Sequence, residues 1–169
     1  APRVAIQALN PGAAGREVLE RMVEVQDGGL QFDLPPGVTD LRLAAEGFGP
    51  TYLWQVDIEG RMQSIGAIRL VRGASVSGTV VDPQSGEPAR DIEVRLQPVE
   101  GLERGDRSSR STRATTRGFF QIQNVPVGQY QLIFMRDKRP VSLFAPLAVS
   151  EDSEVRLDRL PLTPPVQFG

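Results

Sequence analysis

The sequence contains no cysteine and no histidine, and only one of its 19 basic residues, Lys138, is a lysine. Without cysteine there is no disulfide, no thiolate nucleophile and no Cys/His zinc site. Without histidine, Ser-His-Asp catalysis and the most common general base are excluded. No motif for Schiff-base, phosphate-loop or Ser-Lys chemistry surrounds Lys138. The composition therefore excludes most familiar catalytic centres.

Long apolar runs and an excess of one charge are also absent. No apolar run reaches about 18 residues, so we expect neither a membrane-spanning segment nor a signal peptide. The net charge of −2 is too balanced for a protein that mainly neutralises nucleic-acid phosphates. What is present is a chain of 169 residues with 40% hydrophobic residues, 17 glycines and 14 prolines. This suits one domain or two small ones, folded and rich in turns.

Most apolar residues alternate with polar ones, which is the pattern of half-buried β-strands. The alternating segments lie at residues 4–6, 30–32, 41–43, 52–58, 76–80, 92–96, 120–122, 130–132 and 155–157. Because turn residues rather than long helical patterns separate them, we predict an all-β, antiparallel sandwich architecture. Only segment 16–27 also allows a short helix, and there we favour a strand.

The sequence repeats itself loosely. A Pro-x-Gly turn follows an alternating segment at Pro35–Gly37 and again at Pro126–Gly128, and further landmarks recur at nearly the same offset. Such recurrence predicts two tandem β-sandwich modules, residues 1–72 and 73–162, followed by a tail at 163–169. Nothing before Val4 matches the strand expected at 74–81, so the first module is expected to lack its opening strand. The alternative is that residues 4–9 fill that position.

The second module carries a familiar set of motifs. They are Val76-Ser77-Gly78-Thr79-Val80-Val81-Asp82, Gly86-Glu87-Pro88, Ile92–Leu96, Phe120–Val125 and Pro126-x-Gly128-x-Tyr130-x-Leu132. Together with a last strand at Val155, they resemble the carboxypeptidase regulatory-like family, and residues 4–70 do so more loosely. The resemblance implies a transthyretin-like (prealbumin-like) sandwich related to Cna-B-like domains. It also implies a non-catalytic accessory domain of secreted or surface bacterial proteins.

The sole tryptophan and a tyrosine form the first candidate binding pair. On an alternating strand, Tyr52 and Trp54 share a face with Val56 and Ile58. Exposed rings would form a platform on which a sugar stacks, whereas the apolar neighbours favour burial. We interpret the pair as part of the core and keep a carbohydrate site as the alternative.

Arginines crowd the segment that follows residue 100. The candidate ligands for an anionic surface, such as a sulfated glycan, are Arg104, Arg107, Arg110 and Arg113. Acidic residues are interspersed among them, so we prefer an ordinary solvated connection. Acidic groups at 82–87 and 151–154 lack the ligand density of a dedicated calcium loop. We therefore expect no metal and no cofactor.

These observations predict a non-enzymatic module that spaces or docks other domains through its surface or its strand edges. The expected partner is a protein or a cell-surface component, with a glycan as the alternative; we expect neither nucleic-acid binding nor membrane insertion. The expected location is extracellular, periplasmic or at the cell surface. The alternative functions are a carbohydrate-binding module and, more remotely, a hydrolase that uses two carboxylates.

Overall fold

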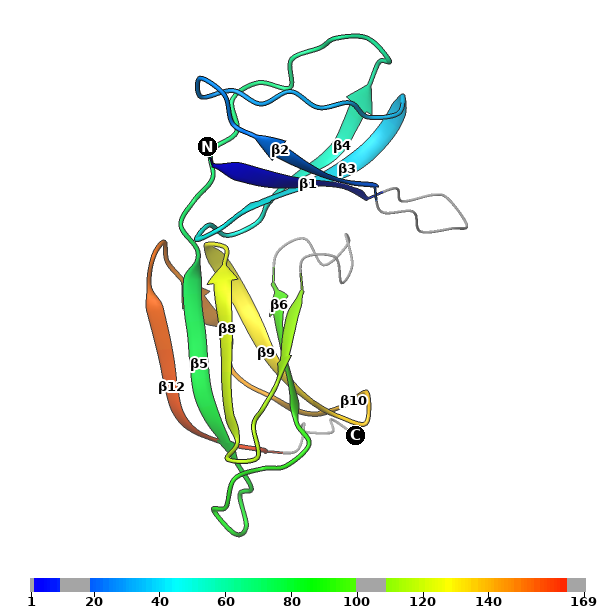
Figure 1. Ribbon diagram of the computed structural model, residues 1–169. Coiled ribbons are helices and arrows are strands. Elements are labelled where there is room, and N and C mark those ends of the chain that lie inside the picture. The colour runs from blue at the N-terminus through cyan, green and yellow to red at the C-terminus, as the bar shows by residue number, and fades with distance from the viewer. Residues whose placement is uncertain (1, 10–18, 100–108, 164–169) are drawn as a thin grey trace. The chain divides into compact units, whose positions relative to one another are not determined.

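The computed structural model describes residues 2–9, 19–99 and 109–163, which form strands, turns and loops (Figure 1). The chain divides into two compact units, Ala1–Arg72 (unit 1) and Gly73–Gly169 (unit 2). Across the described ranges there is no helix long and apolar enough to cross a bilayer. The prediction of an all-β protein is confirmed.

Unit 1 is built on a four-stranded antiparallel sheet with the strand order β2-β1-β3-β4. Its strands are β1 (Arg3–Leu9), β2 (Leu19–Glu24), β3 (Gly37–Ala45) and β4 (Thr51–Ile58). The segment that also allowed a helix is thus a strand, as we favoured. Alternation places one set of side chains on a single face, where they form the buried core of the unit: Val4, Ile6, Ala8, Leu41 and Leu43.

Extended segments pack against the core of unit 1. They contribute Leu30, Phe32, Leu34, Ile65, Ile68 and Leu70, none of which belongs to a strand. The strand predicted at 30–32 is therefore wrong. An alternating pattern shows only that every second side chain is buried. An extended segment can bury every second side chain without pairing with another strand, so the pattern alone does not distinguish the two.

Unit 2 is a sandwich of two sheets, with the orders β12-β5-β8 and β10-β9-β6-β7, and β11 pairs with β9. The strands are β5 (Ala74–Val81), β6 (Glu93–Pro98), β7 (Arg110–Arg113), β8 (Phe119–Val125), β9 (Gly128–Arg136), β10 (Arg139–Leu143), β11 (Leu147–Val149) and β12 (Glu154–Pro161). The predicted sandwich is confirmed here. The sequence pattern did not reveal the short strands β10 and β11.

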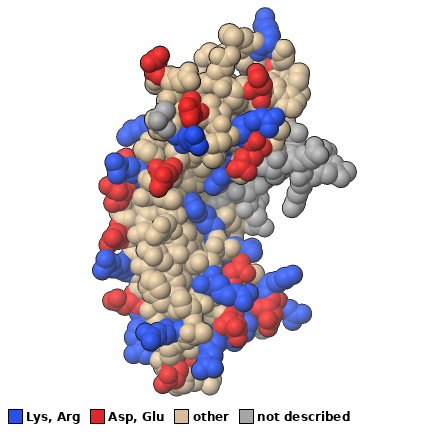
Figure 2. Space-filling view, viewed as in Figure 1, with Lys and Arg blue, Asp and Glu red and all other residues tan. Residues whose placement is uncertain are grey.

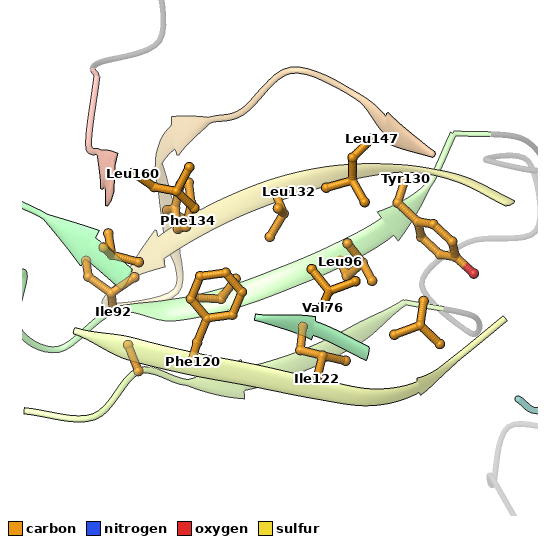
Figure 3. Packing of buried hydrophobic residues seen from close by; sticks show 14 of the residues in the cluster. Val76, Ile92, Leu96, Phe120, Ile122, Tyr130, Leu132, Phe134, Leu147 and Leu160 are labelled. Carbon is orange, nitrogen blue, oxygen red and sulfur yellow. The ribbon is translucent and has the colours of Figure 1, made fainter. Parts of the chain in front are cut away.

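Side chains from both sheets interdigitate in the core of unit 2 (Figure 3). Phe120 and Ile122 of β8 meet Leu132 and Phe134 of β9. Each such side chain contributes about 1.5–3 kcal/mol when it is fully buried. The Pro-x-Gly-x-Tyr motif has a structural role, because the hydroxyl of the buried Tyr130 donates to the carbonyl of Pro126 at 2.8 Å.

One strand pair departs from the antiparallel prediction. β12 runs parallel to β5, from Glu154 opposite Ser75 to Pro161 opposite Val81, with a register shift between Leu157 and Arg159. Gly78 allows the two backbones to approach, since a Cβ at this position would lie 2.5 Å from the carbonyl oxygen of Leu157. Packing, rather than an unusual φ, requires glycine here.

Candidate functional site

Tyr52 and Trp54 stack on each other on β4, with ring centroids 5.2 Å apart and planes inclined by 6°. Both are half-buried, and it is Leu53 and Val56 of the same strand that pack against the core of unit 1. The prediction that the aromatic pair shares the core face with Val56 is therefore wrong.

A β-bulge explains this reversal. Thr39 opposes Val56 and Leu41 opposes Leu53, so two residues of β4, Trp54 and Gln55, oppose the single residue Asp40. Gln55 has a φ of 53°, and its backbone N–H donates to Asp40 Oδ1 at 2.8 Å. The extra residue exchanges the two faces of the strand beyond it. The buried carboxylate of Asp40 thus determines which side chains of β4 face the core.

The stacked geometry does not favour the alternative interpretation, a platform for a sugar. Such a platform needs aromatic faces turned toward the ligand, whereas Tyr52 and Trp54 each direct one face at the other ring. The residue opposite Tyr52 is Arg42, whose guanidinium donates to Gln7 Oε1 at 3.1 Å. This face of the sheet therefore combines aromatic and polar side chains.

The candidate arginines do not form one anion-binding face in the part of the chain that the structure describes. Arg104 and Arg107 lie outside the described residues. Arg110 is half-buried and donates to the carbonyl oxygen of Asn124 at 2.6 Å, which ties β7 to the bulged end of β8. Arg113 is exposed and, three residues along the same strand, points to the opposite side.

Charges of both signs are interspersed on the face of the molecule shown in Figure 2. Among the described residues, no group of three or more acidic side chains is arranged to hold a metal ion. Asp82 instead closes a turn by accepting the backbone N–H groups of Ser85 at 3.0 Å and Gln84 at 2.9 Å. These hydrogen bonds hold the pKa of Asp82 below its ordinary value of 3.8.

The backbone of β2 presents hydrogen-bonding groups at one edge of the unit 1 sheet. The N–H of Val25 donates to the carbonyl of Pro2 at 2.9 Å, and the antiparallel register pairs Arg3 with Glu24. Alternate residues of an antiparallel strand direct their backbone groups to the same side. The residues that direct N–H and C=O away from β1 are therefore Glu20, Met22 and Glu24. Among the described strands, none pairs with this edge.

A groove of about 700 Å³ lies along this edge, between residues 21–24 and 26–33. Its two sides are the arms of a hairpin that opens after a single pair. Gln26 and Gly29 exchange two backbone hydrogen bonds of 2.8 Å across the turn Asp27-Gly28. Beyond this pair the second arm leaves the edge of β2, because its apolar side chains pack against the core instead.

The lining of the groove is acidic overall. Three carboxylates, those of Glu24, Asp27 and Asp33, and one guanidinium, that of Arg21, line it. Arg21 donates to the carbonyl oxygen of Glu20 at 3.2 Å, so part of its charge is used on the edge itself. Met22 is 62% exposed at the centre of the edge. The edge thus offers backbone groups and an apolar side chain with acidic neighbours.

Comparison with known families gives one match. The sequence model of the carboxypeptidase regulatory-like domain matches residues 75–160. No curated protein that was compared with the chain matches it.

Among solved structures, the TIE protein of Bacillus anthracis is 14% identical, with a TM-score of 0.40, over 96% of this chain and 30% of that one. BcpA, the major pilin subunit of Bacillus cereus, is 13% identical, with a TM-score of 0.39, over 96% of this chain and 60% of that one. A minor pilin of Streptococcus agalactiae is 10% identical, with a TM-score of 0.36, over 99% of this chain and 85% of that one. The chain thus spans less than two-thirds of the first two proteins.

Proposed function

The chain belongs to the carboxypeptidase regulatory-like domain family, and from this premise we propose that it is a non-catalytic module that docks a partner by strand addition at β2. The observation that carries this proposal is the edge of β2, which faces a groove instead of a paired strand. An added strand would form the ladder that the opened hairpin does not form itself. A location outside the cytoplasm, which the family resemblance implies, is part of the same proposal.

The distribution of buried polar groups supports a non-catalytic role. Acid–base or nucleophilic catalysis needs several polar side chains that converge on one point. The buried polar side chains of the described residues are Thr39, Asp40 and Ser142. Asp40 holds the bulge of β4, and Ser142 belongs to the other unit. Asp40 thus serves the fold, and the three buried polar side chains do not converge on one reacting centre.

The charge of the groove indicates the chemistry of the partner. Side chains of Glu20 and Glu24 flank Met22 on one face of β2, and Asp27 and Asp33 lie along the groove. Glu24 already forms an ion pair with Arg3 at 3.1 Å, so Glu20 is the glutamate that a partner strand would meet. Opposite charges that face each other across two strands contribute about 0.2–1 kcal/mol per pair. The partner segment is therefore an extended one in which a basic residue opposes Glu20 and an apolar residue opposes Met22.

A short synthetic peptide with the sequence Lys-Thr-Val-Thr-Lys provides the first test, because its lysines and its valine lie on the same face of an extended strand, two residues apart, as Glu20 and Met22 do on β2. We expect the peptide to bind the intact chain in fluorescence anisotropy. N-methylation of the peptide amides that face β2 should abolish binding, whereas N-methylation of the amides that face away should not, because only the former donate to the ladder. Equal effects of both modifications would mean that charge alone holds the peptide and would overturn strand addition.

Two proline variants locate the edge. Met22→Pro removes a backbone N–H that points into the groove, and prolines are tolerated at such edge positions. Asp57→Pro is the matched control at the other edge of the sheet, where Gln63 Nε2 already donates to the carbonyl of Asp57 at 2.8 Å. We expect only Met22→Pro to abolish binding. Loss of binding in Asp57→Pro alone would place docking at β4.

A charge exchange tests the chemistry of the partner. Glu20→Lys should weaken binding of the Lys-Thr-Val-Thr-Lys peptide and should allow a Glu-Thr-Val-Thr-Glu peptide to bind in its place. Unchanged preference for the basic peptide would show that Glu20 does not face the bound strand.

A further inference from the structure

The first and last strands of unit 2 are neighbours in the same sheet (Figure 1). The chain enters the unit at Gly73 and begins β5 at Ala74, and β12 ends at Pro161. Because β5 and β12 are parallel, the start of β5 and the end of β12 lie at opposite ends of their shared ladder.

This arrangement determines how tension acts on the unit. A force applied through the two ends of the unit pulls β5 and β12 in opposite directions along the strands. The inter-strand hydrogen bonds lie across this direction, so they are loaded together in shear and must yield together. In a pair that is pulled apart from one end, by contrast, the bonds break one after another, each under the full force.

We propose that unit 2 is a load-bearing element and that the β5–β12 ladder is its mechanical clamp. The ladder begins with the Ser75 N–H, which donates to the carbonyl of Ser153 at 2.9 Å. It ends with the Leu162 N–H, which donates to the carbonyl of Val81 at 3.1 Å. This property goes beyond docking, since it does not require a partner at β2.

Packing supports the clamp on both sides of the ladder. β5 also pairs with β8, so it is anchored within its sheet. Val155, Leu157 and Leu160 of β12 pack against the core of unit 2. Gly78 lets the backbone of Leu157 approach β5 near the middle of the ladder. Shear must therefore break hydrogen bonds and apolar contacts at the same time.

Unit 1 lacks this geometry among its described residues. Its chain begins in β1, where Val4 opposes Ala45 near the end of β3. It leaves at Arg72, which forms an isolated bridge with Phe48, only three residues beyond Ala45. Both points thus lie at the same end of the sheet, so tension peels the bridge at Phe48 first. We infer that unit 1 yields before unit 2.

Single-molecule force spectroscopy of the full chain, held at its two ends, tests this order. Each unit releases a length of about 3.6 Å per residue, so the shorter unit 1 and the longer unit 2 are distinguished by the length of each step. We expect unit 1 to release first at low force and unit 2 afterwards at a higher force. Release of unit 2 first, or at the same force, would overturn the clamp.

The direction of pulling provides a control that leaves the folded state unchanged. Because the sequence has no cysteine, Glu154→Cys creates a single attachment point at the exposed start of β12. Pulling from the N-terminal end and residue 154 peels the ladder from one end, since Glu154 opposes Ser75. The high-force step should disappear. If it persists at the same force, resistance comes from the core and not from the ladder.

Two proline variants test the ladder directly. In a parallel ladder in which Ser75 donates to Ser153, the N–H of Val155 donates to Ser75 and that of Arg156 points to the outer edge. Val155→Pro should lower the end-to-end unfolding force, and Arg156→Pro should not. Equal effects of the two prolines would contradict the clamp. If Val155→Pro does not fold, the direction-of-pulling experiment decides, and neither result depends on peptide binding at β2.

Discussion

The two units cover an apolar sheet face in different ways. Unit 2 uses a second sheet, so the backbones of both layers are hydrogen-bonded in ladders. Unit 1 uses extended segments that are held by side chains such as Phe32 and Ile68. Both units thus bury an apolar core, but only in unit 2 does the covering layer also form the backbone hydrogen bonds of a sheet. The cover of unit 1 leaves its neighbouring hairpin open, and this opening creates the groove beside β2.

Substitution of a buried core residue by alanine in each unit should give the largest difference in unfolding free energy between the two units. Leu132 is fully buried between the two sheets of unit 2, and Leu132→Ala should cost about 3–5 kcal/mol of unfolding free energy. Leu43 is equally buried in unit 1, and Leu43→Ala should cost about 2–3 kcal/mol, because its extended cover can collapse onto the cavity. Hydrogen exchange of β9 and β3 measures the two effects separately. An equal or larger cost for Leu43→Ala would contradict the difference.

Removal of the carboxylate that holds the β4 bulge should have the next largest effect. Asp40→Ala leaves the backbone N–H of Gln55 without its acceptor and should cost about 1.5–3 kcal/mol. Asp40→Asn keeps an acceptor oxygen and should recover most of that loss. The emission of Trp54, which lies in the bulge, follows unfolding of unit 1. Equal destabilisation by alanine and asparagine would mean that the acceptor is not what matters.

A methyl group at Gly78 tests the ladder that unit 2 has and unit 1 lacks. Gly78→Ala pushes a Cβ against the backbone of Leu157 and should cost about 1–3 kcal/mol in denaturant unfolding. The matched control is Gly29→Ala in unit 1, whose Cβ would lie at an ordinary 3.6 Å from the carbonyl of Gln26. A Gly78 variant as stable as the control would show that β12 moves without cost.

Acid should weaken one turn of unit 2 only slightly. Because the pKa of Asp82 is lower in the folded chain, its hydrogen bonds contribute stability above pH 3.8, and this contribution is lost as the pH falls through the lowered value. The amide resonances of Ser85 and Gln84 should titrate with a midpoint below 3.8, and this titration should vanish in Asp82→Asn. A midpoint at or above 3.8 would show that the hydrogen bonds of the turn do not stabilise the charged form of Asp82.

The sequence predicted those strands in which buried and exposed side chains alternate regularly. Alternation identified β1, β3, β4, β5, β6, β8, β9 and β12, and the motifs of unit 2 identified its family. Alternation failed at residues 30–32, because strand pairing depends on a distant neighbour that a local pattern does not contain. It also assigned Trp54 to the wrong face, since the bulge is held by a contact between Asp40 and Gln55.

Within the described part of the chain, the site residues predicted from the sequence do not line the groove, and the reasons are similar. Tyr52 and Trp54 proved to be a stacked pair, and Arg110 proved to be a link between β7 and β8. Strand-edge pairing was expected from a missing strand, but β2 itself was not singled out. One signal was available: the turn Asp27-Gly28 is typical of a hairpin, and the apolar alternation after it ends in Pro35-Pro36. A hairpin whose second arm is needed by the core leaves its first arm exposed.

The pairing of β5 with β12 also affects how the protein is synthesised. The ribosome releases β5 early and β12 last, so the sheet that contains β5 remains incomplete until nearly all of unit 2 has been translated. Contacts between residues so distant in the sequence slow folding and prolong exposure of apolar surface in the nascent chain. We expect polypeptides truncated before Glu154 to be recognised by chaperones and proteases, whereas those that include Pro161 escape them.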